Sequence, residues 1–179
     1  MDKWLFQKEA IDKIVRGFSS NQESRLLLII PTGGGKTLTA IRAIDNLIKK
    51  GVIDKNNKCL WVTHLRSLKD QTIRVRDNVD NHDFIKEFNF SDNLSECLEI
   101  EMLKAAKEIV SADTERKYKF IILDECHHSS ANSYQTFFDR QRFGILGLTA
   151  TPKRLDRRAL NFEKIVYQIT ADRLQDLGD

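Results

Sequence analysis

Residues 30–37, Ile-Pro-Thr-Gly-Gly-Gly-Lys-Thr, hold the side chains whose types and spacing most clearly predict chemistry. They directly follow an apolar run, which is typical of a buried strand that enters a turn and then a helix. Successive glycines let backbone N–H groups converge on an anion, and the following helix adds the positive end of its dipole. Lys36 can reach the β- and γ-phosphates of a nucleotide, and Thr37 can offer its hydroxyl to Mg²⁺. The segment predicts a phosphate-binding loop, although Ile30 replaces the first glycine of the generic pattern; the alternative is a glycine-rich turn without a ligand.

Two adjacent carboxylates, Asp124 and Glu125, follow a second apolar run at residues 120–123. Two acids at the end of a buried strand are costly unless a cation or a proton offsets them, and nucleotide-bound Mg²⁺ is a natural cation here. Asp124 would hold the metal, mostly through its waters, and Glu125 would orient and deprotonate the attacking water. The alternative is a helix N-terminus that favours acids. For His127, which follows in the same segment, we expect a hydrogen-bonding role near the γ-phosphate. A role as zinc ligand is not expected, because the spacing typical of zinc ligands is not met.

A third polar segment, at residues 147–152, places Thr149 and Thr151 on either side of a small residue before Pro152. The proline ends the element, and the two hydroxyls can bridge neighbouring segments through short hydrogen bonds. This segment is weak evidence for function by itself. It becomes informative because it follows the first two segments in the chain.

Short apolar runs that alternate with helical patterns predict a parallel α/β sheet, in which ligands bind outside the carboxyl ends of the strands. We expect strands at residues 25–30, 59–63, 120–123, 145–148 and 165–169, with one short strand within 84–90. We expect helices at residues 3–18, 37–50, 67–78, 98–110 and 133–140, and a short helix at the C-terminus. All three polar segments then fall at strand ends.

Composition sets broad limits on the class of protein. The chain has 179 residues, enough for one domain with a sizeable core, and its 29 Lys+Arg against 26 Asp+Glu give a net charge of +3, too small to establish nucleic-acid binding. Three cysteines without metal or disulfide spacing fit a reducing compartment, so we expect a cytoplasmic protein. Neither a signal peptide nor a membrane-spanning run is visible, and we expect no membrane partner.

The order of these segments resembles the first motor domain of a superfamily 2 helicase or translocase. The loop resembles motif I, residues 124–127 resemble motif II in its DExH form, and residues 149–151 resemble motif III. Gln7 is similar to the glutamine that reads adenine in the family, and residues 62–71 resemble motif Ia. Residues 146–156 and Phe162 are closest to the branch that holds type I and type III restriction-enzyme motors and DNA repair helicases.

The resemblance implies a RecA-like three-layer P-loop NTPase fold, with a mostly parallel central sheet and helices on both faces, over a single domain at residues 1–179. It implies an ATP hydrolase that uses Mg²⁺ and couples hydrolysis to movement on, or unwinding of, DNA. The implied nucleotide-binding residues are Gln7, Thr32, Gly33, Gly34, Gly35, Lys36, Thr37, Thr149 and Thr151. The implied catalytic residues are Lys36, Asp124, Glu125 and His127, with Thr37 and Asp124 at the metal and with Trp4 or Phe6 near the base. The implied nucleic-acid contacts are made by His64, Arg66 and Lys69, with Lys153 and Arg154 as further candidates. The alternative for all five is that they form part of a solvated surface without a ligand.

Two features depart from the family pattern. Residues 99–103, where motif Ib is expected, contain two acids. The chain also ends before the second RecA-like domain, which supplies the arginine finger in the family. We therefore expect residue 179 to be a boundary within a longer protein, and this chain alone to bind nucleotide weakly and hydrolyse it slowly or not at all. A nuclease or methylase partner fits the restriction-enzyme branch, and DNA is a better fit than RNA. The alternatives are an RNA helicase or RNA-sensing DExH ATPase, a non-motor nucleotide-gated adaptor and, least favoured, a small-molecule kinase.

Overall fold

The computed structural model describes residues 4–126, 131–139, 142–151 and 162–177. A six-stranded sheet forms its centre, in the order β3-β2-β4-β5-β1-β6, and every pair of neighbouring strands is parallel. The strands are β1 Arg25–Ile29, β2 Lys58–Thr63, β3 Leu98–Met102, β4 Tyr118–Leu123, β5 Gly144–Thr149 and β6 Lys164–Gln168. The α/β fold with a parallel sheet is thus confirmed.

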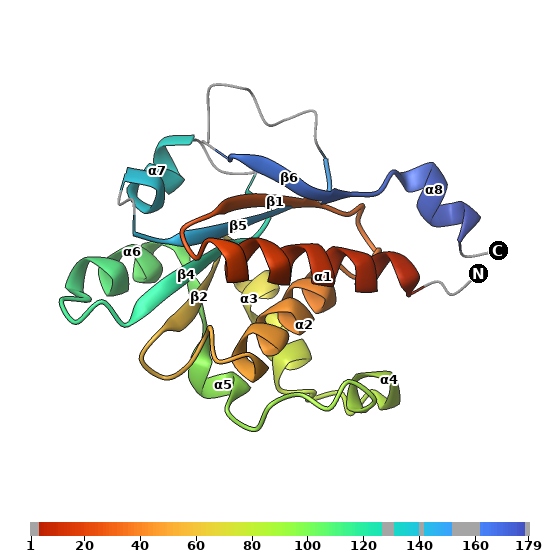
Figure 1. Ribbon diagram of the computed structural model, residues 1–179, viewed down its shortest axis with the longest axis horizontal. Coiled ribbons are helices and arrows are strands. Elements are labelled where there is room, and N and C mark those ends of the chain that lie inside the picture. The colour runs from red at the N-terminus through yellow and green to blue at the C-terminus, as the bar shows by residue number, and fades with distance from the viewer. Residues whose placement is uncertain (1–3, 127–130, 140–141, 152–161, 178–179) are drawn as a thin grey trace.

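Helices cover both faces of this sheet (Figure 1). They are α1 Leu5–Ser20, α2 Lys36–Lys49, α3 Arg66–Arg76, α4 Asp83–Lys86, α5 Leu94–Cys97, α6 Leu103–Ala112, α7 Ala131–Asp139 and α8 Ala171–Asp176. One apolar cluster joins α1, α2 and α5 to one sheet face, and a second cluster joins α6 and α7 to the other. Because alternate strand residues point to opposite faces, Leu26 and Leu28 belong to the first cluster while Leu27 and Ile29 belong to the second.

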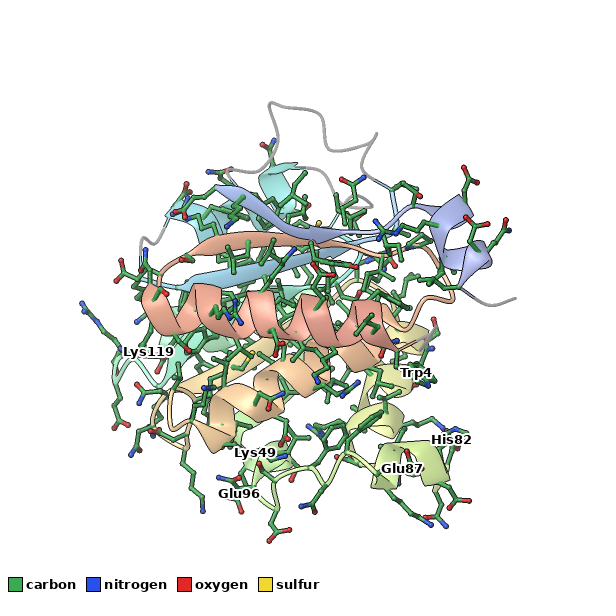
Figure 2. The ribbon with its side chains drawn as sticks, turned by 45° about the vertical axis from the view of Figure 1, so that its right-hand side comes forward. Trp4, Lys49, His82, Glu87, Glu96 and Lys119 are labelled. Atoms are coloured by element: carbon green, nitrogen blue, oxygen red, sulfur yellow. The ribbon has the colours of Figure 1, made fainter. Side chains whose placement is uncertain are left out.

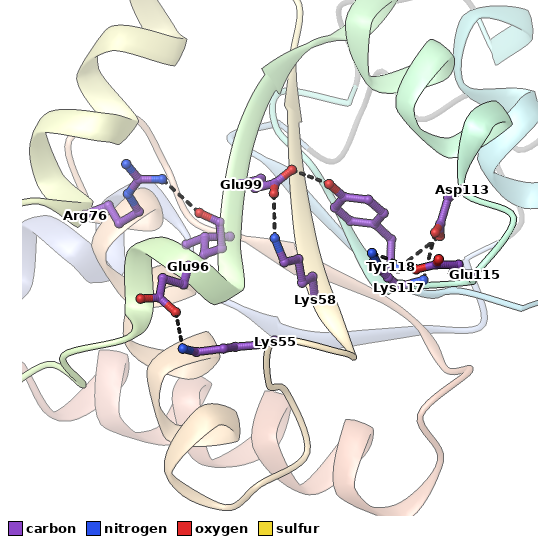
Figure 3. A network of polar contacts seen from close by, with 10 residues as sticks. Lys55, Lys58, Arg76, Glu96, Glu99, Asp113, Glu115, Lys117 and Tyr118 are labelled. Atoms are coloured by element: carbon purple, nitrogen blue, oxygen red, sulfur yellow. Dashed lines mark hydrogen bonds and ion pairs between the residues drawn. The ribbon is translucent and has the colours of Figure 1, made fainter.

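The prediction of a helix over residues 98–110 is wrong in its first half. Residues 98–102 form the edge strand β3, and only from Leu103 does the chain become helical. The alternation of Leu98 and Ile100 with two acids suits a strand, because both acids find cations on neighbouring elements. Glu99 accepts hydrogen bonds from Lys58, at 2.8 Å, and from the Tyr118 hydroxyl (Figure 3).

The expected short strand within residues 84–90 is also wrong. The segment contains the single turn α4 and then packs along the outer, polar side of α2. The guanidinium of Arg42 lies 3.9 Å from the centre of the Phe88 ring, and Lys49 donates to the carbonyl of Asn89 at 2.8 Å. These contacts replace the strand neighbour that an apolar run would otherwise require.

Among the described residues, none of the helices combines the length and the apolar character needed to cross a lipid bilayer. The three cysteines are free and buried.

The Glu99 contacts predict a pH-dependent contribution to stability. Burial of Glu99 raises the pKa of its carboxyl, but the hydrogen bonds from Lys58 and Tyr118 outweigh burial and hold the pKa below its usual value. A lowered carboxyl pKa stabilises the fold above the unfolded pKa, and this contribution is lost as pH falls through the folded pKa. Glu99→Gln should lower the free energy of unfolding by about 0.5–1 kcal/mol at neutral pH, and not in acid.

Urea denaturation across pH measures this difference. Glu96→Gln is the matched control, because Glu96 forms an ion pair with Lys55 that is largely exposed, and its loss should change stability little. A Glu99→Gln deficit that stays constant from neutral to acid pH would refute the assignment.

Candidate nucleotide site

The loop between β1 and α2 depends on its three glycines for different reasons. Gly33 and Gly35 have φ angles of 83° and 77°, in the left-handed region that favours glycine. A Cβ atom on Gly34 would lie 2.5 Å from the Ile30 side chain and 3.1 Å from the Pro31 carbonyl oxygen. Gly35 also serves as the N-cap of α2. The loop therefore brings backbone N–H groups and the start of a 14-residue helix to one place, as an anion site requires.

Lys36, the first residue of α2, reaches across the site to Glu125. Its amine forms an ion pair with the Glu125 carboxylate, and only 9% of Lys36 is exposed. Strand order explains the contact, because only β5 lies between β4 and β1 and all of these parallel strands end at the same edge of the sheet. Glu125 has a φ of 49°, an uncommon value for a residue with a side chain, and this turn directs it out of the strand.

Asp124 lies at the buried end of β4. Its backbone N–H donates to the Val62 carbonyl at 2.9 Å, and its Oδ2 atom lies 3.4 Å from the indole nitrogen of Trp61. The residue is 2% exposed, and burial raises the pKa of its carboxyl, with Lys36 acting in the opposite direction. A buried carboxylate whose charge is only partly offset is suited to a cation.

Gln7 lies beneath the phosphate-binding loop. It is 1% exposed, and its Nε2 atom donates to the Gly34 carbonyl at 3.2 Å. A Cβ atom on Gly35 would lie 2.4 Å from the same nitrogen, so the Gln7 amide and the loop backbone are closely fitted. The Gln7 Oε1 atom is buried without a hydrogen-bond partner among the described residues. The structure thus gives Gln7 a supporting role at the loop, and its contact with adenine stays a prediction.

A cavity of about 550 Å³ joins these groups. One part of it is lined by Trp4 just before α1, Phe6 of α1, Leu174 of α8 and Leu177 just after α8. Helix α8 lies near the beginning of α1 (Figures 1 and 2). The predicted residues that line it are Gln7, Thr32, Gly33, Gly34, Gly35, Lys36, Thr37, Asp124 and Glu125. Trp4 and Phe6 also line it, and their place near the base stays a prediction.

Sequence reasoning missed the contributions of α3 and α8 to this cavity. Leu68, Gln71 and Val75 from α3 also line it, at intervals of three and four residues that place them on one face of the helix. This spacing is visible in the sequence, but nothing in the sequence connects this face of α3 with the phosphate-binding loop. The two leucines of α8 follow the last strand and carry no sequence signal at all.

Two predicted motif III residues lie outside the cavity lining. Thr149 is fully buried, and its hydroxyl accepts a hydrogen bond from the Thr151 backbone N–H at 3.2 Å. The Thr149 carbonyl accepts from the N–H of Ile30, also at 3.2 Å. This motif therefore anchors the start of the phosphate-binding loop through its backbone. His127, Lys153 and Arg154 lie outside the described residues.

The predicted nucleic-acid residues gather where β2 ends and α3 begins. His64 and Arg66 flank Leu65, an apolar side chain that is 50% exposed. Lys69 forms an ion pair with Glu101 of β3 at 2.7 Å. This group lies at the same edge of the sheet as the cavity. Arg66 and Lys69 belong to α3, whose residues Leu68, Gln71 and Val75 line the cavity.

Comparisons with known proteins agree with this geometry. Residues 5–154 match the model of a family described as "Type III restriction enzyme, res subunit". The chain is 28% identical over 177 residues to IRC3 of Saccharomyces cerevisiae, named as a candidate ATP-dependent helicase, covering 90% of this chain and 25% of IRC3. It is 30% identical over 167 residues to the EcoAI type I restriction enzyme endonuclease subunit of Escherichia coli, covering 83% and 19%. The chain thus spans a quarter or less of each relative.

Solved structures show the same fold. The type ISP restriction-modification enzyme LlaGI, determined in complex with a DNA substrate mimic, matches 96% of this chain and 20% of its own, with 18% identity and a TM-score of 0.69. The UvsW helicase of bacteriophage T4 matches 97% of this chain and 56% of its own, with 17% identity and a TM-score of 0.55. From motif order, site geometry and the family match together, the chain belongs to the family of the type III restriction enzyme res subunit, as a first motor domain of the superfamily 2 helicases.

Proposed function

We propose that this chain binds Mg-ATP and is the ATP-binding half of a DNA helicase or translocase that hydrolyses ATP. The observation that supports this most strongly is the convergence of Lys36, Asp124 and Glu125 on a glycine loop at the edge of one cavity. A cation, a buried carboxylate and a second carboxylate held by that cation are the groups that phosphoryl transfer to water needs.

The residues present fit a nucleotide with its magnesium ion. Gly33 and Gly35 have the left-handed φ angles with which successive backbone N–H groups can form an anion-binding concavity. The raised pKa of Asp124 marks a carboxylate with too little positive charge around it. The Thr63 hydroxyl, at the end of the neighbouring strand, is buried without a hydrogen-bond partner among the described residues, which adds a polar group to this region. Thr37 and Asp124 would hold the ion, and bound Mg²⁺ would neutralise charge on the transferring phosphoryl group.

The ion pair between Lys36 and Glu125 suggests an order of events within the site. Lys36 must exchange the Glu125 carboxylate for phosphate oxygens when it holds a nucleotide. Glu125 is then left to orient a water molecule and accept its proton. His127, two residues after Glu125, is proposed to hydrogen-bond near the γ-phosphate.

The activity of the whole protein rests on parts beyond this chain. Both curated relatives are at least four times longer than their match to it, which supports a second RecA-like domain in the full-length protein. An arginine from that domain would contribute roughly 10³–10⁵ in rate, so this chain alone should turn over slowly. The match to an endonuclease subunit supports a nuclease or methylase partner. Free buried cysteines support a reducing compartment such as the cytoplasm.

Nucleotide binding and turnover should separate in two variants. Lys36→Ala should abolish detectable ATP binding, because the amine is the cation within the loop. Glu125→Gln should keep binding and lower single-turnover hydrolysis by at least about 100-fold, the scale of a lost general base. Lys49→Ala is the matched control, since Lys49 forms an ion pair with Asp45 at the other end of α2 (Figure 2). These rates are compared in the full-length protein, where a Glu125→Gln turnover close to that of the unaltered protein would exclude Glu125 as the base.

Removal of the Asp124 charge should stabilise the fold while it removes magnesium-dependent binding. Because the pKa of Asp124 is raised in the folded state, ionised Asp124 destabilises the protein as pH rises from the unfolded to the folded pKa. In metal-free buffer at neutral pH, Asp124→Asn should raise the free energy of unfolding by about 1 kcal/mol, a typical size for one substitution. The advantage should vanish in acid, where both proteins are uncharged at this position. A destabilised Asp124→Asn variant at neutral pH would contradict the argument.

Nucleic-acid binding should depend on the beginning of α3. Arg66→Ala should weaken binding of single-stranded or duplex DNA and reduce the slope of log K against log salt by about 1, as expected for one lost phosphate contact. Arg74→Ala is the control on the same helix, because Arg74 is paired with Asp80 near its other end. Fluorescence anisotropy with DNA and RNA strands would measure both. Equal slopes for the two variants would remove Arg66 from the interface, and tighter binding to RNA would favour the RNA helicase alternative.

A further inference from the structure

Trp61 is a fully buried aromatic side chain next to the predicted metal ligand. It lies in β2 and is 0% exposed, which is uncommon for so large a residue. An indole N–H can only donate, and when buried it needs an acceptor. The nearby acceptor is Asp124, whose Oδ2 atom lies 3.4 Å from Nε1 of Trp61.

Strand register explains why these two side chains meet. Trp61 is paired with Ile122 of β4, two residues before Asp124, so both side chains lie on the same face of the sheet. The backbone N–H of Asp124 donates to Val62, the residue after Trp61. β2 therefore holds Asp124 twice, once through its backbone and once through its carboxylate.

The contact orients the carboxylate more than it neutralises it. At 3.4 Å it is longer than a typical N–H···O hydrogen bond of about 2.9–3.0 Å. Because the indole contacts Oδ2, it fixes the rotation of the carboxylate that would hold a cation.

We propose that Trp61 is a positioning residue for the magnesium site: its indole N–H holds Oδ2 of Asp124 and so fixes the orientation of the carboxylate that would hold the ion. This inference rests on the proposed function. Hydrogen-bonded partners of metal-ligating carboxylates set ligand orientation, and their loss commonly weakens metal affinity by about 10–100-fold.

Trp61→Phe removes the N–H and keeps an aromatic ring. Calorimetric titrations of ATP into this chain, across a series of Mg²⁺ concentrations and in EDTA, provide the readout without turnover. The variant should need about 10-fold more Mg²⁺ for half of the magnesium-dependent gain in affinity, with unchanged affinity in EDTA. Phe18→Leu is the control, because Phe18 is 1% exposed in the same apolar cluster, so it should lose stability without shifting the Mg²⁺ midpoint.

The outcomes separate this inference from the proposed function. An unaltered chain that binds ATP without any dependence on Mg²⁺ would overturn the proposed function and the inference with it. A normal Mg²⁺ response in the unaltered chain, with the same midpoint in Trp61→Phe, would overturn the inference alone.

A second measurement avoids any loss of folding in Trp61→Phe. The chain has two tryptophans, so Trp4→Phe leaves Trp61 as its sole indole fluorophore. At saturating ATP, addition of Mg²⁺ to Trp4→Phe should change the Trp61 emission, since the acceptor of its N–H then ligates a cation. Unchanged emission on Mg²⁺ binding would overturn the inference.

Discussion

The charges of Lys36, Asp124 and Glu125 constrain the rest of the structure, because they lie together in a site that is largely closed to water. Burial of three charges is tolerated only when each has an oppositely charged partner in the protein or gains one from a bound ligand. The parallel sheet meets this requirement by ending β1 and β4 at one edge, with only β5 between them. The glycine loop lets Lys36 begin a helix directly beside the two acids.

Neighbouring elements then hold the components of this site. Gln7 supports the loop from α1, Thr149 anchors its beginning from β5, and Trp61 contacts Asp124 from β2. None of these three residues belongs to the glycine-lysine-threonine pattern itself. They explain why the domain needs elements from almost its whole length to build one binding site.

Helix α3 connects the nucleotide cavity with the predicted nucleic-acid surface. Leu68, Gln71 and Val75 line the cavity, while Arg66 lies in the first turn of the same helix. The same helix thus borders the cavity and carries a residue of the predicted nucleic-acid surface. The pairing of Lys69 with Glu101 also ties this helix to β3, the edge strand.

The sequence predicted the parts of the fold whose signals are local. Apolar runs followed by glycine or paired acids located β1, β4 and their loops, and the charged groups at their ends proved to lie together. The edge strand β3 was mistaken for a helix because Glu99 and Glu101 suit a strand only beside Lys58, Tyr118 and Lys69. Long-range partners also decided the placement of Phe88 against Arg42 and of α8 at the cavity, and no periodicity along the chain reports such partners.

The most direct test of the account is a crystal structure of this chain with Mg²⁺ and a non-hydrolysable ATP analogue. The account predicts that the Lys36 amine has left Glu125 for phosphate oxygens, with the metal beside Thr37 and Asp124. Triphosphate bound elsewhere, or bound at the loop while Lys36 still contacts Glu125, would contradict it.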